Sequence, residues 1–191
     1  AAAGIVFFIA ANWDVFDVFG RFILVEALLV ASAGLALWKS PPLRVGQGAL
    51  LFSFIMTGAL LALFGQTYQT GADVYELFLT WSVLALPLVI ASQWSASWAA
   101  WAFVLNLALG LFCGMRPEGG PFWFVLSGAG LKQTYLLLLP MMINLSLWAI
   151  GEYVEQTRWS HLVPRWLNRL IVAFAVAYGT WAGTRAIFGE N

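Results

Sequence analysis

Residues 45–65 read VGQGALLFSFIMTGALLALFG, a continuous run without a charged side chain. The hydrocarbon core of a bilayer is about 30 Å thick, and a helix that rises about 1.5 Å per residue needs about 20 residues to cross it. This run therefore predicts a membrane-spanning helix, and the rest of the sequence can be compared with it.

Other apolar runs of similar length lie on both sides of it. They cover residues 22–38, 75–92, 95–115, 131–151 and 166–188. So many long runs cannot all be buried in one small soluble core. Residues 1–11 are also apolar, but as a helix they would reach only about 16 Å. We therefore expect an all-α fold, a polytopic transmembrane bundle of about seven helices whose first helix is incomplete.

The domain organisation follows from the same runs. We expect one transmembrane domain over residues 1–191, with 120–130 as an apolar interfacial or re-entrant segment too short to cross. The sequence starts with Ala1 and carries neither a positive leading segment nor a cleavage signal, so we expect it to start inside a helix.

The composition excludes several classes of function. Hydrophobic residues make up 62% of the chain and charged residues 9%, against about 25% charged in soluble domains. Nine basic residues balance nine acidic ones, which leaves no basic field for nucleic acid. Cys113 and His161 are the single cysteine and histidine, and no nucleotide-binding, zinc-protease or nucleophile motif is present. We therefore expect no catalytic residues, no metal and no cofactor.

The basic residues also predict an orientation, because cytoplasmic connections of membrane proteins are enriched in Lys and Arg. One set of connections and adjoining helix ends holds Lys39, Arg44, Arg158, Arg165 and Arg169; the other holds Arg21, Arg116, Lys132 and Arg185. This small excess favours a chain in a bacterial inner membrane that starts in the cytoplasm and ends in the periplasm.

Small residues and prolines mark the expected packing of the helices. Gly110 and Gly114 form one G-x-x-x-G pair, and Gly179 and Gly183 form another. Such spacing lets helix backbones approach closely, either within the bundle or against a partner subunit. Ala49, Ser53 and Thr57 repeat at the same interval. Pro87 and Pro140 lie inside two of the apolar runs and predict kinks.

A polar rim is expected on the outer side of the bundle. It combines residues 12–17, 65–76 and 116–118. Gln66, Gln69, Asp73 and Glu76 would share one face if their segment were helical, but Gly71 favours a turn instead. The rim suits a hard cation, a proton or another polar ligand. The alternative is ordinary polar loops in which Asp14 and Asp73 cap the following helices.

Individual polar residues inside the runs add further hypotheses. Glu26 lies about one turn inside its helix, where a carboxylate either serves a function or needs a structural partner. Asn106 and Asn144 are mid-helix amides that we expect to hydrogen-bond across helices. Glu152 and Glu155 are followed at the same spacing by Arg158, which predicts surface pairs on a helix that continues past the bilayer.

Two segments resemble a known family. They are FFIAANWD at residues 7–14 and ALFGQTYQTGADVYELFLTW at residues 62–81. They are similar to bacterial predicted inner-membrane proteins grouped as domain-of-unknown-function family 2157, over about residues 1–110. The resemblance implies a multi-pass membrane protein and carries no activity. It places Asn12, Trp13, Asp14, Gln66, Tyr68, Gln69 and Asp73 in the family's motifs. Members commonly have a short cytoplasmic segment before the first helix, and this sequence lacks it.

Three functions are compatible with these features. The first is a non-enzymatic accessory or scaffold subunit, with the lipid bilayer and other membrane-protein subunits, or a second copy, as partners. The second is a small-solute or ion permease that uses the polar rim and Glu26. A membrane enzyme that acts on lipid or quinone is the third, and the lack of catalytic groups disfavours it.

Overall fold

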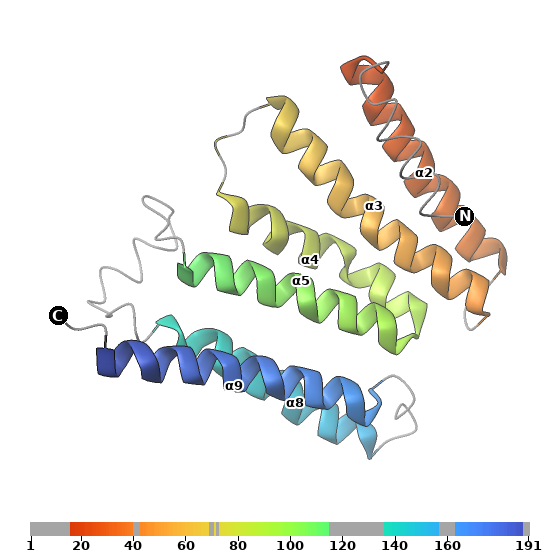
Figure 1. Ribbon diagram of the computed structural model, residues 1–191. Helices are drawn as coiled ribbons and strands as arrows, with labels where there is room; N and C mark the ends of the chain where they lie inside the picture. The colour runs from red at the N-terminus through yellow and green to blue at the C-terminus, as the bar shows by residue number, and fades with distance from the viewer. Residues whose placement is uncertain are drawn as a thin grey trace.

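The computed structural model describes residues 16–39, 43–68, 71, 73–114, 136–156 and 163–188. Six helices make up these parts of the chain (Figure 1). Their bounds are α2 Val18–Lys39, α3 Arg44–Tyr68, α4 Val74–Ser92, α5 Ser95–Gly114, α8 Leu138–Glu155 and α9 Arg165–Phe188. Each coincides with one of the apolar runs, so the all-helical class is confirmed.

Five of these helices, α2, α3, α4, α5 and α9, are long and apolar enough to cross a membrane. The described helix that falls outside this set is α8, which has 18 residues and carries Glu152 and Glu155 near its end. The expected count of seven is not confirmed. The short run 1–11 and the segment 120–130 lie outside the described residues.

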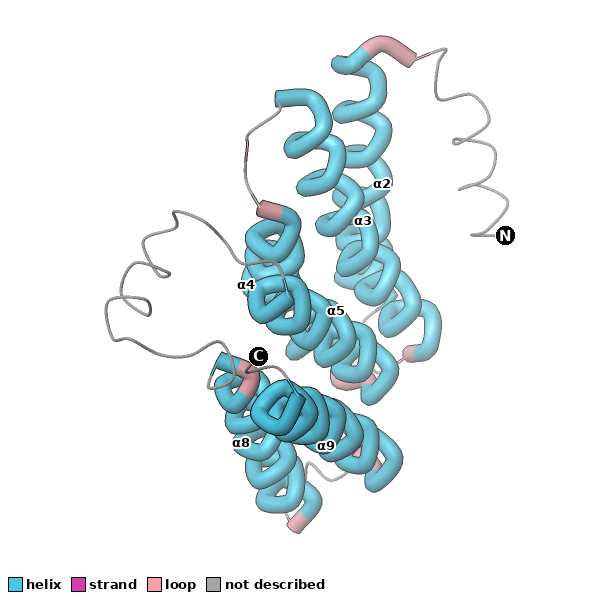
Figure 2. Tube along the Cα trace, turned by 60° about the vertical axis from the view of Figure 1, so that its left-hand side comes forward, coloured by secondary structure: helices cyan, strands magenta, loops and turns pink. Residues whose placement is uncertain are grey.

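The helices form a row of three hairpins (Figure 2). Each helix from α2 to α5 packs mainly on its neighbours in sequence, α8 packs on α9, and α5 makes smaller contacts with α8 and α9. Helices α2, α4 and α8 end at one end of the row, and α3 ends at the other (Figure 1).

Small polar residues join α2 to α3. The hydroxyls of Ser32 and Ser53 are hydrogen-bonded at 2.7 Å, and Ser53 also donates to the carbonyl of Ala49 at 3.1 Å. Ser53 is completely buried, and Ala36 packs beside Ala49 in the same contact. The small residues at positions 49 and 53 therefore pack inside the protein, where they let the two backbones approach.

Tryptophans fill the contacts from α3 to α5. The ring of Trp81 lies so close to Gly58 that an added Cβ would overlap it, and its Nε1 donates to the carbonyl of Phe54 at 2.8 Å. Trp101 donates in the same way from α5 to the carbonyl of Ser82 at 2.9 Å. Both indoles thus bury a large apolar surface with their N–H groups satisfied.

The prolines behave differently from each other. Pro87 lies inside α4 as expected. Pro140, in contrast, lies in the first turn of α8, because that helix begins at Leu138 rather than near the start of the apolar run. The backbone N–H groups in the first turn of a helix have no carbonyl acceptor within that helix. A proline there, which lacks the N–H, therefore removes no helical hydrogen bond. Residues 131–135, which precede this point in the apolar run, lie outside the described residues, so the kink expected at Pro140 stays a prediction.

Candidate functional site

Part of the expected outer rim lies outside the described residues, including Asn12, Trp13, Asp14, Gln69 and residues 116–118. The part that is described lies around the connection between α3 and α4. There α3 ends at Tyr68, Gly71 adopts a left-handed φ of 65°, and α4 begins at Val74. Gln66 therefore lies in α3 and Glu76 in α4, so one continuous helical face does not carry both, and Gly71 has the positive φ that glycine adopts at little cost.

A cavity of about 520 Å³ lies beside this turn, between the end of α3 and the start of α4. Its polar lining comes from Gln66, Asp73, Glu76 and Thr80. The remaining lining is mostly apolar and includes Leu61, Phe64 and Leu77. Three of the expected rim residues therefore surround one concave site.

The backbone at this turn leaves the carboxylate of Asp73 available. Asp73 occupies the N-cap position of α4 with an extended backbone, but its side chain makes no capping hydrogen bond. The cap contact comes from the backbone, since the amide of Glu76 donates to the carbonyl of Asp73 at 2.9 Å. The carboxylate of Glu76 accepts a hydrogen bond from the hydroxyl of Tyr75 at 3.2 Å.

Two other expected site residues do not line this cavity. The ring of Tyr68 is exposed and contacts Phe64 and Phe22, with centroids 4.7 and 6.3 Å apart. Glu26 follows Phe22 by one turn on α2 and is exposed, while Val25 beside it is buried. The structure therefore brings Gln66, Asp73 and Glu76 together, and Glu26 belongs to another surface.

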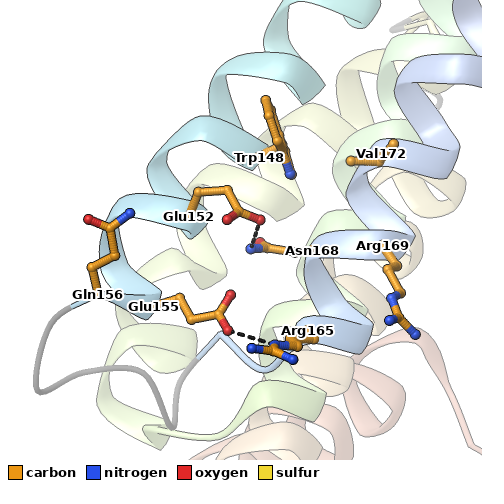
Figure 3. A pocket seen from close by; sticks show the side chains of 8 residues that line it. All are labelled: Trp148, Glu152, Glu155, Gln156, Arg165, Asn168, Arg169 and Val172. Atoms are coloured by element: carbon orange, nitrogen blue, oxygen red, sulfur yellow. Dashed lines mark hydrogen bonds and ion pairs between the residues drawn. The ribbon is translucent and has the colours of Figure 1, made fainter.

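A second cavity, of about 570 Å³, lies between the end of α8 and the start of α9 (Figure 3). It is lined by Trp148, Glu152, Glu155, Gln156, Arg165, Asn168, Arg169 and Val172. The acidic side chains come from α8 and the basic ones from α9, so opposite charges face each other across the hairpin.

Two contacts organise this second cavity. Arg165 Nε donates to Glu155 Oε1 at 3.0 Å, which makes an ion pair at the exposed edge. Deeper in, Asn168 Nδ2 donates to Glu152 Oε1 at 3.2 Å. Asn168 is only 4% exposed, and it packs so tightly on Gly151 that a side chain there would overlap its amide. The Asn168 amide thus holds the Glu152 carboxylate in a fixed place.

The sequence interpretation missed this cavity. It paired Glu152 and Glu155 with Arg158 along one helix, but Arg158 lies outside the described residues and Glu155 pairs with Arg165. A usable signal was present. Glu152 and Glu155 are spaced by three and share one face at the end of one helix. The polar residues at 165, 168 and 169 share a face at the start of the next helix, and two consecutive helices joined by a short connection pair as a hairpin.

A buried polar network lies nearer the middle of the helices. The side-chain amides of Asn106 and Asn144 donate to each other's Oδ1 at 3.1 and 2.7 Å, and each also donates to a carbonyl one turn earlier. The Tyr178 hydroxyl donates to the Asn106 carbonyl at 2.7 Å. The expected hydrogen bond across helices is confirmed. Because these amide donors and acceptors are satisfied within the protein, the network is structural.

The expected packing glycines differ in their surroundings. A Cβ at Gly110 would lie 3.1 Å from the Tyr178 hydroxyl, and one at Gly179 would lie 3.1 Å from Met141 Sδ. Gly183 has nothing within 4 Å. The surroundings of Gly114 are outside the described residues. Gly110 and Gly179 thus face neighbouring helices of this chain, and Gly183 faces outward.

Metal ligation has no candidate in the described ranges, since no group of three His, Cys, Asp or Glu side chains there could hold a metal ion. Comparison with protein families gives one match: the family described as "Predicted membrane protein (DUF2157)" matches residues 1–98. Comparisons with curated proteins and with solved structures find no match. The matched half contains α2, α3, α4 and the first cavity.

Proposed function

The chain belongs to the DUF2157 family of predicted membrane proteins, and from this premise we propose that it is a non-enzymatic accessory or scaffold subunit. In this role its outward helix faces pack against other membrane-protein subunits or a second copy of the chain. The surface of the last helix supports this role more directly than any other feature.

The outward face of α9 is built from small residues. Ala173, Ala177, Thr180 and Gly183 follow one another at spacings of four, three and three, and all are exposed. The Thr180 hydroxyl is satisfied by the carbonyl of Val176 at 2.8 Å. A helix face that contacts only lipid does not require small residues. A helix face that packs against a second helix does benefit from them, because small residues let the two backbones approach closely. This stripe is the observation that carries the proposal.

The first described helix shows a similar stripe. Ala27, Ala31 and Gly34 lie at spacings of four and three on α2 and are exposed, and Gly34 has nothing within 4 Å. Helices α2 and α9 belong to the two end hairpins of the row (Figure 2). The protein therefore presents a small-residue face at each end, as a subunit between two neighbours would.

The location belongs to the same proposal. We place the protein in a bacterial inner membrane, with the start of the chain in the cytoplasm and its end in the periplasm. In the described helices and their flanks, Lys39, Arg44, Arg165 and Arg169 lie at one end of the row, and Arg21 and Arg185 at the other. The more basic end is expected to face the cytoplasm.

The second candidate function is a small-solute or ion permease. The cavity between α3 and α4 favours it, because Gln66, Asp73 and Glu76 line one concave site of ligand size. The exposed position of Glu26, away from that cavity, weighs against a path that continues into the membrane. We therefore rank the permease below the scaffold.

The native mass of the protein, extracted gently from its own membrane, tests the proposal. We expect a stoichiometric assembly. Ala177→Leu should raise its dissociation constant about tenfold, because an overpacked contact costs about 1–3 kcal/mol. Val83→Leu, which enlarges an exposed side chain on α4, is the matched control and should leave the assembly intact.

A lone monomer whose mass is the same with and without Ala177→Leu would overturn the scaffold role. The permease would then become the leading function, and solute flux would be the next measurement. An assembly weakened equally by Ala177→Leu and Val83→Leu would also count against the proposal, because it would not depend on the α9 stripe.

A further inference from the structure

The cavity between α8 and α9 lies where the apolar part of this hairpin ends. From Leu138 to Gly151 helix α8 has no charged residue, and from Leu170 to Thr184 helix α9 has none. The two boundaries lie at the same level, because Gly151 packs against Asn168. The charged cavity therefore begins at the level where an apolar hairpin would meet lipid headgroups.

The charges in this cavity are only partly matched. Glu155 is paired with Arg165 at 3.0 Å. Glu152 accepts a hydrogen bond from the neutral Asn168 amide and is also attracted by Arg165, but it forms no ion pair of its own with a described residue. Arg169 also lines the cavity and forms no ion pair with any described residue. Within the described hairpin, Glu152 thus offers a carboxylate without an ion pair, and Arg169 offers a guanidinium without one at the edge of the cavity, where Figure 3 shows it directed away from Glu152.

We propose that this cavity binds the headgroup of a phospholipid that carries both a phosphate and a primary ammonium group. The ammonium donates to the carboxylate of Glu152, and the phosphate accepts from the guanidinium of Arg169. The volume of about 570 Å³ lies within the range of small-ligand sites, roughly 300–1,000 Å³. This site is independent of the proposed scaffold role.

The lining favours a primary amine over a choline headgroup. A trimethylated ammonium has no N–H to donate and is usually held by a cage of aromatic rings. Among the described residues that line this cavity, Trp148 is the one aromatic residue, whereas Glu152 is a hydrogen-bond acceptor that receives the Asn168 amide. Trp148 and Val172 supply apolar surface for the glycerol and the first acyl carbons.

Native mass spectrometry of the full chain in mild detergent tests the proposal. Phosphatidylethanolamine, phosphatidylcholine and phosphatidylglycerol with identical acyl chains are added in turn. We expect phosphatidylethanolamine to bind about fivefold more tightly than the other two lipids. The reason is the additional charge pair between its ammonium group and Glu152 near the protein surface. Glu152→Gln should remove this preference, while Arg169→Gln should weaken all three lipids, because all three carry a phosphate.

The control is Arg185→Gln, which removes a guanidinium at the far end of α9 and should leave the preference unchanged. Equal binding of the three lipids to the unmodified protein would overturn the proposal, as would a preference that survives Glu152→Gln. A soluble competitor, O-phosphoethanolamine, distinguishes the source of the headgroup. Displacement of the lipid by an equal concentration of this compound would contradict a lipid site.

Discussion

At the scale of single residues, buried polar groups connect α5 to the last hairpin, next to a hydrophobic cluster that includes Leu109, Phe112 and Ala182. The Asn106–Asn144 amide pair joins α5 to α8, and the Tyr178 hydroxyl joins α9 to the same point. The backbones of these helices approach at few points, and their other contacts are those of the hydrophobic side chains. In a membrane such hydrogen bonds are modest individually, at about 0.6–2 kcal/mol, so the pair matters through its position.

The amide pair gives the first prediction. Asn144→Leu should destabilise the protein by about 1–2 kcal/mol, because it leaves the buried Oδ1 of Asn106 without a donor. Asn106→Leu should cost a similar amount. The double variant should cost less than the sum by about 1 kcal/mol, since the remaining group no longer lacks a partner. Unfolding equilibria in detergent measure all three values.

Ser146→Ala is the control for this double-mutant cycle. Its hydroxyl donates to the carbonyl of Met142 on the exposed side of the same helix, so its loss should change stability by less than about 0.5 kcal/mol. Strict additivity of the two asparagine substitutions would show that the amides do not depend on each other.

At the scale of elements, hydrophobic length decided most of what the sequence could predict. The apolar runs predict each described helix because a bilayer requires about 20 residues regardless of what the helix packs against. The ends were harder to place. Helix α3 continues through Gln66 to Tyr68, and α8 begins only at Leu138, since polar residues and Pro140 are tolerated in terminal turns.

The candidate sites divide in the same way. Gln66, Asp73 and Glu76 could be grouped from the sequence because a short turn forces them together. Glu26 could not be assigned, because the rotation of α2 depends on which side Val25, Ser32 and Ala36 present to α3. Asn168 meets Glu152 because of the register between α8 and α9. The periodicity of each helix shows which residues share a face, but it does not show how two helices align with each other.

The turn between α4 and α5 gives a prediction at this scale. Gln93 ends α4 in the left-handed region, with φ 47° and ψ 36°, and its N–H donates to the carbonyl of Ile90. Gln93→Gly should raise the unfolding midpoint by about 2 °C, because glycine adopts this conformation without the Cβ penalty. Gln93→Val should lower the midpoint, since a β-branched residue tolerates positive φ least. A midpoint unchanged in both variants would mean that this turn stores no strain.

At the scale of the whole molecule, an open row of hairpins leaves each helix with surface that its own chain does not cover. In an apolar stretch of 18 residues within each helix, only 11%, 17% and 22% of the residues of α2, α4 and α9 are buried, against 39% in α3 and α5. Helices α3 and α5 are thus the most covered helices of the row, and α2 and α9 at its two ends present the surfaces that we propose for contact with neighbours. This arrangement suits a subunit that packs between neighbours better than a closed bundle around a path.

The row also makes a prediction about orientation that involves both ends of one helix. Asp73 and Gln93 flank α4 and are exposed, and the 19 residues between them reach about 28 Å as a helix. With Cys113 replaced by alanine, we introduce Asp73→Cys or Gln93→Cys and add a membrane-impermeant maleimide to intact cells. Asp73→Cys should react at once, and Gln93→Cys only after permeabilisation, because the more basic end of the row should face the cytoplasm.

The unmodified protein supplies the control, because Cys113 is 2% exposed and should stay unlabelled before and after permeabilisation. The reverse pattern would keep α4 as a crossing helix and invert the whole row, which would place the α8–α9 cavity in the outer leaflet. Labelling of both cysteines in intact cells would instead remove α4 from the membrane. Since α4 packs on α3 and α5 along its length, that result would contradict the transmembrane arrangement of its neighbours as well.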